Sequence, residues 1–210
     1  MKKVYIFCLG IILLSFTLAV FCYSAMPEKM ASHWGMNGEV NGYMPKFWGL
    51  FLMPLVSLVI FGLFVLIPKI DPLKENIVKF RKYFDWFIVL LEIFLLYVYI
   101  LTLVWNVGIR FNFSLAIIPA MALFFYYIGI LVEKSERNWF VGIRNPWTLS
   151  NEIVWKKTHK LGGRLFKVAG LVTFSGILFP EYAFLLFVLP AIVFAIFINF
   201  YSYFIFKKQK

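Results

Sequence analysis

The chain has 210 residues, of which 62% are hydrophobic, 21% aromatic and only 15% charged. A soluble domain carries about a quarter charged residues and about half apolar ones, so this composition excludes an ordinary soluble globular protein. The net charge of +11 would suggest nucleic acid in a soluble protein, but here the basic residues flank apolar runs. We therefore expect an all-α integral membrane protein whose basic residues face the lipid bilayer, with no direct nucleic-acid partner.

Apolar runs long enough to cross a bilayer are recognised by their length, because a spanning helix needs about 20 residues. Six candidate spans cover residues 4–25, 47–67, 84–106, 113–132, 165–179 and 182–206. The first run is longer than the core of a cleaved signal peptide, so we retain it as a helix. The fifth is short and can span only if Arg164 and Lys167 extend their side chains to the interface.

Lysine and arginine are unequally distributed between the two sides of these spans. Of the 21 such residues, only Lys29, Lys46 and Arg110 fall on one side. The positive-inside rule therefore predicts an N-in/C-in arrangement, with both termini in the cytoplasm. We expect residues 1–80 to form a two-span module with an extracytoplasmic hairpin loop, and residues 81–210 a four-span module with a cytoplasmic signature loop.

The outer loop, residues 26–46, carries two turn signals. Asn37-Gly38 is predicted to form a two-residue hairpin turn, since both residue types tolerate positive φ. Asn41-Gly42 is a second candidate turn.

His33 is the one group of the outer loop that titrates near neutral pH. It could contact a ligand, a peptide or a metal, or it could hydrogen-bond the hairpin and hold its shape. A metal would need more ligands than His33, Glu28 and Glu39 offer, so we favour the structural role and expect no metal and no cofactor. Trp34 and Tyr43 are expected at the level of the headgroups.

Span three carries a polar residue at every seventh position, at Asp85, Glu92, Tyr99 and Asn106. At 3.6 residues per turn these positions form one slowly drifting stripe on an otherwise apolar helix. An acid at mid-membrane depth costs about 2.5–3.5 kcal/mol unless it finds a partner, so Glu92 is expected to face the bundle interior.

Several side chains could pair with Glu92. Asn199 in span six lies at a matching depth, and Thr173 and Ser175 in span five are further candidates. Glu92 could be a proton or ligand site, or it could make a hydrogen bond between helices worth about 0.6–2 kcal/mol. We favour the hydrogen bond, because the spans contain no paired cation.

The loop between spans four and five includes the dense polar and aromatic stretch GIRNPWTLSNEIVWKKTHKLGG, residues 142–163. Ser150 or Asn151 can cap a helix of about three turns, and Gly162-Gly163 is predicted to end it.

This predicted helix is amphipathic when projected at about 100° per residue. Its apolar face consists of Val154, Trp155, Thr158 and Leu161. Its polar face consists of Glu152, Lys156, His159 and Lys160. We expect a short interfacial helix between spans four and five, with its basic face toward the headgroups. The remaining polar residues of the loop either cap the inner ends of the bundle or form a docking surface, and both alternatives stay open.

Residues 137–166, RNWFVGIRNPWTLSNEIVWKKTHKLGGRLF, closely resemble the signature of the SdpI family, which is named for the immunity protein against the sporulation-delaying peptide toxin. Carried over by position, the signature residues are Asn138, Gly142, Arg144, Pro146, Trp147, Thr148, Asn151, Glu152, Trp155, Lys157, Thr158, His159 and Gly163. The outer loop resembles an amino-terminal module often fused to that family, through Pro27, His33, Trp34, Gly38, Gly42, Tyr43 and Lys46. It departs from that module at Met30-Ala31 and Asn41.

The resemblance implies a multi-pass protein of the cell membrane that gives immunity to a secreted, membrane-active peptide toxin. It also implies signal transduction, in which the cytoplasmic face captures a soluble transcriptional repressor. A small transporter using Glu92 is the alternative, although we find no inverted repeat or broken pair of spans. An enzyme is least favoured, because the sequence contains no zinc-protease helix motif, nucleophile elbow or phosphate-binding loop.

Overall fold

The computed structural model describes residues 2–209 of the chain. Within that range the long helices are α1 (Lys2–Cys22), α2 (Lys46–Ile70), α4 (Arg81–Val107), α5 (Phe113–Lys134), α7 (Glu152–Ser175) and α8 (Ala183–Lys207). Shorter elements are η1 (Tyr23–Ala25), α3 (Lys74–Lys79), α6 (Pro146–Ser150) and η2 (Pro180–Tyr182), and the strands are β1 (Lys29–Trp34) and β2 (Val40–Pro45). The protein is therefore a helical bundle with one β-hairpin.

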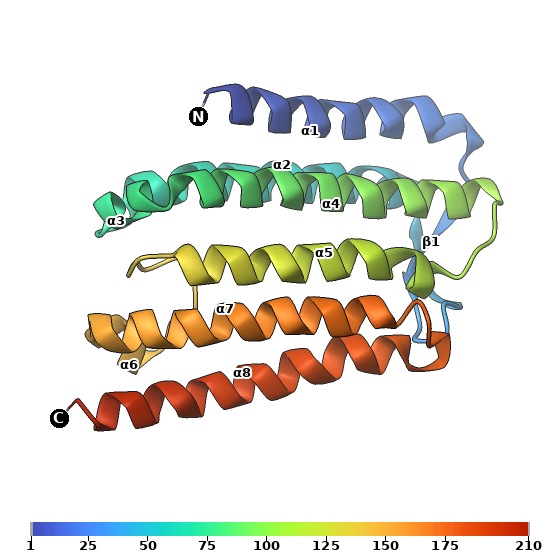
Figure 1. The fold of residues 1–210 in the computed structure, drawn as a ribbon. Helices are drawn as coiled ribbons and strands as arrows, with labels where there is room; N and C mark the ends of the chain where they lie inside the picture. Colours follow the sequence, from blue (N-terminus) through green and yellow to red (C-terminus); the bar gives the residue numbers. More distant parts are fainter. Residues whose placement is uncertain (1, 210) are drawn as a thin grey trace.

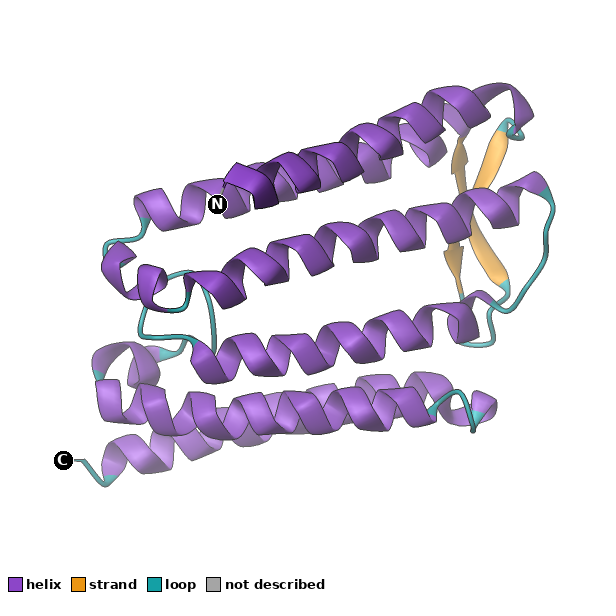
Figure 2. Cartoon of the chain, turned by 45° about the horizontal axis from the view of Figure 1, so that its top comes forward, coloured by secondary structure: helices purple, strands orange, loops and turns teal. Residues whose placement is uncertain are grey.

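The bundle has two distinct ends. Both termini lie at the same end as α3 and α6, which we call the signature end, and the β-hairpin lies at the opposite end, the hairpin end (Figure 1). Helix α4 packs against α1, α2 and α5, and α7 packs between α5 and α8. In both views the long helices run side by side between the two ends (Figures 1 and 2).

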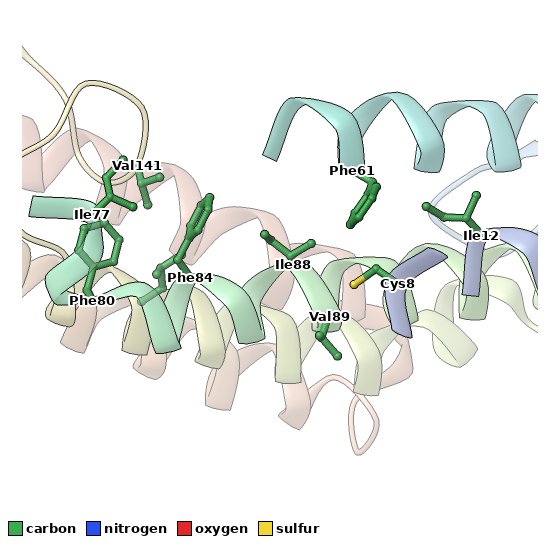
Figure 3. Close-up of a cluster of buried hydrophobic side chains, with 10 residues drawn as sticks. Cys8, Ile12, Phe61, Ile77, Phe80, Phe84, Ile88, Val89 and Val141 are labelled. Carbon is green, nitrogen blue, oxygen red and sulfur yellow. The ribbon is translucent and has the colours of Figure 1, made fainter. Parts of the chain in front are cut away.

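Apolar side chains hold the first helices together. Figure 3 shows a buried cluster that joins Cys8 of α1, Phe61 of α2 and Phe84 of α4. Val141, from the loop between α5 and α6, belongs to the same cluster. This loop is therefore packed onto the bundle.

Lipid is the natural environment of the outer surface. Among the described residues, α1, α2, α4, α5 and α8 lie in segments long and apolar enough to cross a membrane. They expose large apolar side chains such as Phe21, which is 82% exposed, and Phe197, which is 50% exposed. An all-α membrane protein is therefore confirmed, apart from the hairpin. Helix α7 is absent from this apolar set because basic residues follow one another along its first half.

The predicted interfacial helix is wrong, because α7 runs without a break from Glu152 to Ser175. Gly162 and Gly163 are buried within it instead of ending it. A Cβ on Gly163 would lie 2.6 Å from the carbonyl oxygen of Gly129 in α5. Gly163 therefore serves close helix packing, a role that small residues commonly have in membrane helices, whereas Gly162 makes room for the side chain of Ile143.

A second pair of small residues continues the contact between α5 and α7. A Cβ on Gly170 would lie 2.7 Å from the carbonyl oxygen of Ala122. Near the signature end, Lys167 of α7 forms a salt bridge of 2.6 Å with Glu133 of α5. Lys167 therefore pairs within the bundle, whereas Arg164 is exposed.

The predicted hairpin exists, but its turn differs from the prediction. Trp34 pairs with Val40, so residues 35–39 form the connection, which is longer than a two-residue turn. Gly38 has the expected positive φ, at 78°. Asn41-Gly42 lies within β2 and forms no turn. The register shifts between Ala31 and Trp34, and the strand pairing continues past this irregularity to Trp34 and Val40.

Candidate functional site

The signature loop, residues 135–145, is organised by the buried side chain of Asn138. Its Oδ1 accepts hydrogen bonds from the backbone N–H groups of Phe140 and Val141, at 2.9 and 2.6 Å. Its Nδ2 donates to the carbonyl oxygens of Glu136 and Val141, each at 2.8 Å. One amide thus uses both its donors and its acceptor to fix a turn that has no regular secondary structure.

His159 joins this loop to α7. Its Nδ1 hydrogen-bonds the carbonyl of Trp155 at 2.9 Å, and its Nε2 accepts the backbone N–H of Ile143 at 2.9 Å. Because Nε2 accepts, the ring is neutral and the proton is on Nδ1. Burial lowers the pKa of His159 to about 4, while the hydrogen bond to Trp155 acts in the opposite direction. The prediction that His159 lies on the exposed polar face is therefore wrong, because the loop covers this side of α7.

Gly142 lets the loop approach His159 closely. Its φ is +116°, and a Cβ there would lie 2.4 Å from Nε2 of His159. A side chain at this position would meet both backbone strain and a steric clash.

Trp155, one turn before His159 on α7, adds a second contact between this helix and the signature loop. Its ring is stacked on His159, with centroids 3.8 Å apart, and its Nε1 donates to the carbonyl oxygen of Ser135 at 2.9 Å. Asn151 caps α7 by accepting from the N–H groups of Ile153 and Val154, as predicted.

The short helix α6 begins with a capping box. The side chain of Asn145 accepts from the backbone N–H of Thr148 at 2.9 Å, and the Thr148 hydroxyl accepts from the backbone N–H of Asn145 at 3.0 Å. Pro146 occupies the first turn, where its missing N–H has no cost. The Asn145 side chain also donates to Asn199 and Ser202 of α8, at 3.1 and 2.8 Å. Asn145 thereby connects the loop, α6 and α8.

Burial divides the signature residues into groups. Those that are buried are Asn138, Thr148, Trp155, Thr158, His159 and Gly163. Those that are exposed are Arg144, Pro146, Glu152 and Lys157. Gly142, Trp147 and Asn151 are half-buried. Most of the motif therefore holds three helices and a loop together, and only its exposed members are free to meet a partner.

The polar stripe of α4 faces the bundle interior, as predicted. Asp85, Glu92, Tyr99 and Asn106 are all buried. Asp85 forms a salt bridge of 2.6 Å with Arg81.

Glu92 has a different partner from those expected. It accepts a hydrogen bond from Ser57 of α2, and not from Asn199, Thr173 or Ser175. A matching depth in the membrane does not make Asn199 a partner of Glu92, because α4 packs against α1 and α2, whereas α8 packs against α7. The sequence signal that we missed is a serine within the apolar second span.

Asn106 ties α4 to the hairpin. Its side chain accepts from the N–H of Ala31 at 2.8 Å and donates to the carbonyl of the same residue at 3.0 Å. The stripe thus ends in a contact that positions β1 over the bundle.

The outer-loop candidates are mainly held by contacts within the hairpin end. His33 hydrogen-bonds Asn41 on the opposite strand, in agreement with a structural role. Gly42 faces His33, and a Cβ there would lie 2.9 Å from the Cβ of His33. Lys46 forms a salt bridge of 2.8 Å with Glu28, whereas Tyr43 is exposed.

Trp34 is partly buried against the helices beneath the hairpin, and its place at the headgroup level stays a prediction. Its ring stacks on Phe113 of α5, with centroids 3.9 Å apart, and meets Trp105 of α4 edge-on. The hairpin is therefore anchored to the helices on both sides of the loop between α4 and α5. Among the described residues, no group of three or more His, Cys, Asp or Glu side chains is placed to hold a metal ion.

Comparison with known proteins identifies the signature region. Residues 134–202 match the model of the SdpI/YfhL protein family. The chain is also 26% identical over 204 residues to the immunity protein SdpI of Bacillus subtilis (strain 168). The aligned residues cover 94% of this chain and 93% of the relative. The resemblance to the SdpI family is confirmed. No solved structure matches the chain.

The match to the SdpI family covers the whole signature loop, α6, α7 and most of α8. Residues 10–58 match a domain of unknown function (DUF1648), which covers most of α1, the hairpin and the first half of α2. Together with the long apolar helices, this relationship makes the chain a multi-pass plasma-membrane protein.

Proposed function

We propose that this protein gives its cell immunity to a secreted, membrane-active peptide toxin. The similarity to the immunity protein SdpI supports this function, because it extends over nearly the whole of both chains. The bundle would act from within the bilayer, by engaging the peptide before it damages the membrane.

The proposed topology has six spans with both termini in the cytoplasm. The fifth span would cover residues 165–179, so that the first half of α7, including His159, lies outside the hydrocarbon. The basic residues of this first half would lie at the inner interface, beside anionic headgroups. Both termini lie at one end of the bundle, which agrees with an even number of crossings (Figure 1).

Cell killing tests the proposed immunity directly. Toxin-sensitive cells that express this protein should survive exposure to the sporulation-delaying peptide, whereas cells with an empty vector should die. Equal killing of both strains, with the protein present in the membrane, would overturn the proposal.

We also propose that the signature end captures a soluble transcriptional repressor when toxin is bound. Arg144 and Lys157 are exposed there, next to a rigid loop, and offer positive charge without disturbing the buried contacts. A fluorescently tagged DNA-binding regulator encoded beside this protein should move to the membrane on toxin addition. A regulator that stays in the cytoplasm during effective immunity would exclude this signalling role and leave immunity intact.

A further inference from the structure

A cavity of about 330 Å³ lies beneath the hairpin, at the hairpin end of the bundle. Residues of β1, α2, α4, α5, α7 and α8 line it. Most of the wall is apolar, and its bulky members include Met53, Phe113, Phe184 and Phe187. This volume is at the lower end of the range for small-ligand sites, roughly 300–1,000 Å³.

Two hydrogen-bond donors in the cavity wall lack partners among the described residues. These are Nε1 of Trp34 and Oγ1 of Thr173, and both atoms are buried. Thr173 is fully buried on α7. Buried polar groups are nearly always hydrogen-bonded, so two such atoms in one cavity indicate a missing acceptor.

Of the other three hydroxyl-bearing residues in the wall, Ser32, Thr102 and Ser114, the last two are hydrogen-bonded within the protein. Ser114 donates to the carbonyl of Gly35 at 3.1 Å, and Thr102 donates to the carbonyl of Val98 at 2.9 Å. No Asp, Glu, Lys or Arg among the described residues lines the cavity. The site therefore suits an uncharged apolar group that brings hydrogen-bond acceptors.

We propose that this cavity binds an apolar segment of the peptide toxin, whose free backbone carbonyls accept from Trp34 and Thr173. The inference rests on the proposed immunity function. A peptide segment places carbonyl groups directly beside apolar side chains, which is the combination that the wall requires. A phospholipid would bring a charged headgroup, for which the wall offers no charged partner.

Substitutions that remove the N–H and the hydroxyl but keep an apolar side chain test the two donors. Trp34→Phe and Thr173→Val remove the N–H and the hydroxyl, and Thr173→Ser is the matched control that keeps a hydroxyl. We expect the double variant to need at least tenfold less sporulation-delaying peptide for half-maximal killing, and Thr173→Ser to protect like the wild type. The amount of folded protein is measured in each strain by size-exclusion chromatography of a fluorescent fusion.

Photocrosslinking locates the peptide itself. A benzophenone amino acid replaces Phe187 in the cavity wall, or Phe197 on the lipid-exposed surface of α8 as a control. The peptide should crosslink at position 187 and at least tenfold less at position 197.

The outcomes separate the two proposals. If the wild type protects but the double variant protects equally, or if position 187 captures only lipid, the cavity proposal is wrong and immunity stands. If the wild type does not protect, the immunity function itself is wrong.

Discussion

The two ends of the bundle satisfy their polar groups in different ways. At the signature end, Asn138 and His159 use their hydrogen-bonding atoms on the loop around them, and the Thr158 hydroxyl is the exception. At the hairpin end, Trp34 and Thr173 direct unused donors into a cavity. The densest sequence motif thus marks the end whose polar groups are more completely hydrogen-bonded, whereas the binding site that we propose lies at the other end.

The largest effect on stability is expected from a substitution that separates α5 from α7. Gly163→Leu should destabilise the protein by about 3 kcal/mol or more, because its side chain would collide with the backbone of Gly129. Gly62→Leu is the matched control, since a Cβ at Gly62 meets nothing within 4 Å. Unfolding in detergent measures both variants, and equal stability of the two would contradict the proposed packing role.

The next largest effect is expected from acid. The folded pKa of His159, about 4, is below the ordinary value of 6.5, so the unfolded chain binds the extra proton first. The stabilisation is fully present above about pH 6.5, is lost as the pH falls toward 4, and amounts to roughly 3 kcal/mol.

The variant His159→Gln isolates this contribution from that of the carboxylates. It should be less stable than the wild type at pH 7.5 and show a shallower loss of unfolding free energy between pH 6.5 and 4. Parallel pH profiles of the two proteins would show that His159 does not titrate as described.

Glu92 allows a sharper test of the interior stripe. Glu92→Gln and Ser57→Ala should each cost about 1 kcal/mol, and a double-mutant cycle should give a coupling of about 0.6–2 kcal/mol. A purely structural hydrogen bond predicts full protection by Glu92→Gln. Loss of gradient-driven solute flux in this variant, at the same amount of folded protein in the membrane, would instead favour the transporter alternative.

The spacing of polar residues predicted which face of a helix is buried, but not which helices pack against each other. The sevenfold spacing from Asp85 to Asn106 correctly placed a polar stripe on the inner face of α4, and Asn151 was correctly placed as a cap. The partner of Glu92 could not be predicted, because depth along a span does not specify its neighbours. Gly162-Gly163 was misread because glycine both ends helices and allows them to pack, and only Gly129 on another helix decides between these roles.

The division into modules at residue 80 stays a prediction. Contacts cross it, since Glu92 meets Ser57 and Asn106 meets Ala31. The two family matches leave residues 59–133 between them, including α4. Helix α4, which lies in this stretch, thus makes contacts across the predicted boundary.

The smallest effect on stability is expected at the exposed part of the signature end. Arg144→Glu with Lys157→Glu should lower the unfolding free energy by no more than about 1 kcal/mol, because neither side chain is buried and Arg144 loses one exposed hydrogen bond, to the carbonyl of Trp139. The same change should abolish toxin-dependent recruitment of the regulator while immunity persists, since the cavity at the opposite end is untouched. Glu152→Lys is the matched control of opposite sign, and it should retain recruitment. If the charge-reversed double variant still recruits the regulator, its docking surface lies elsewhere on the protein.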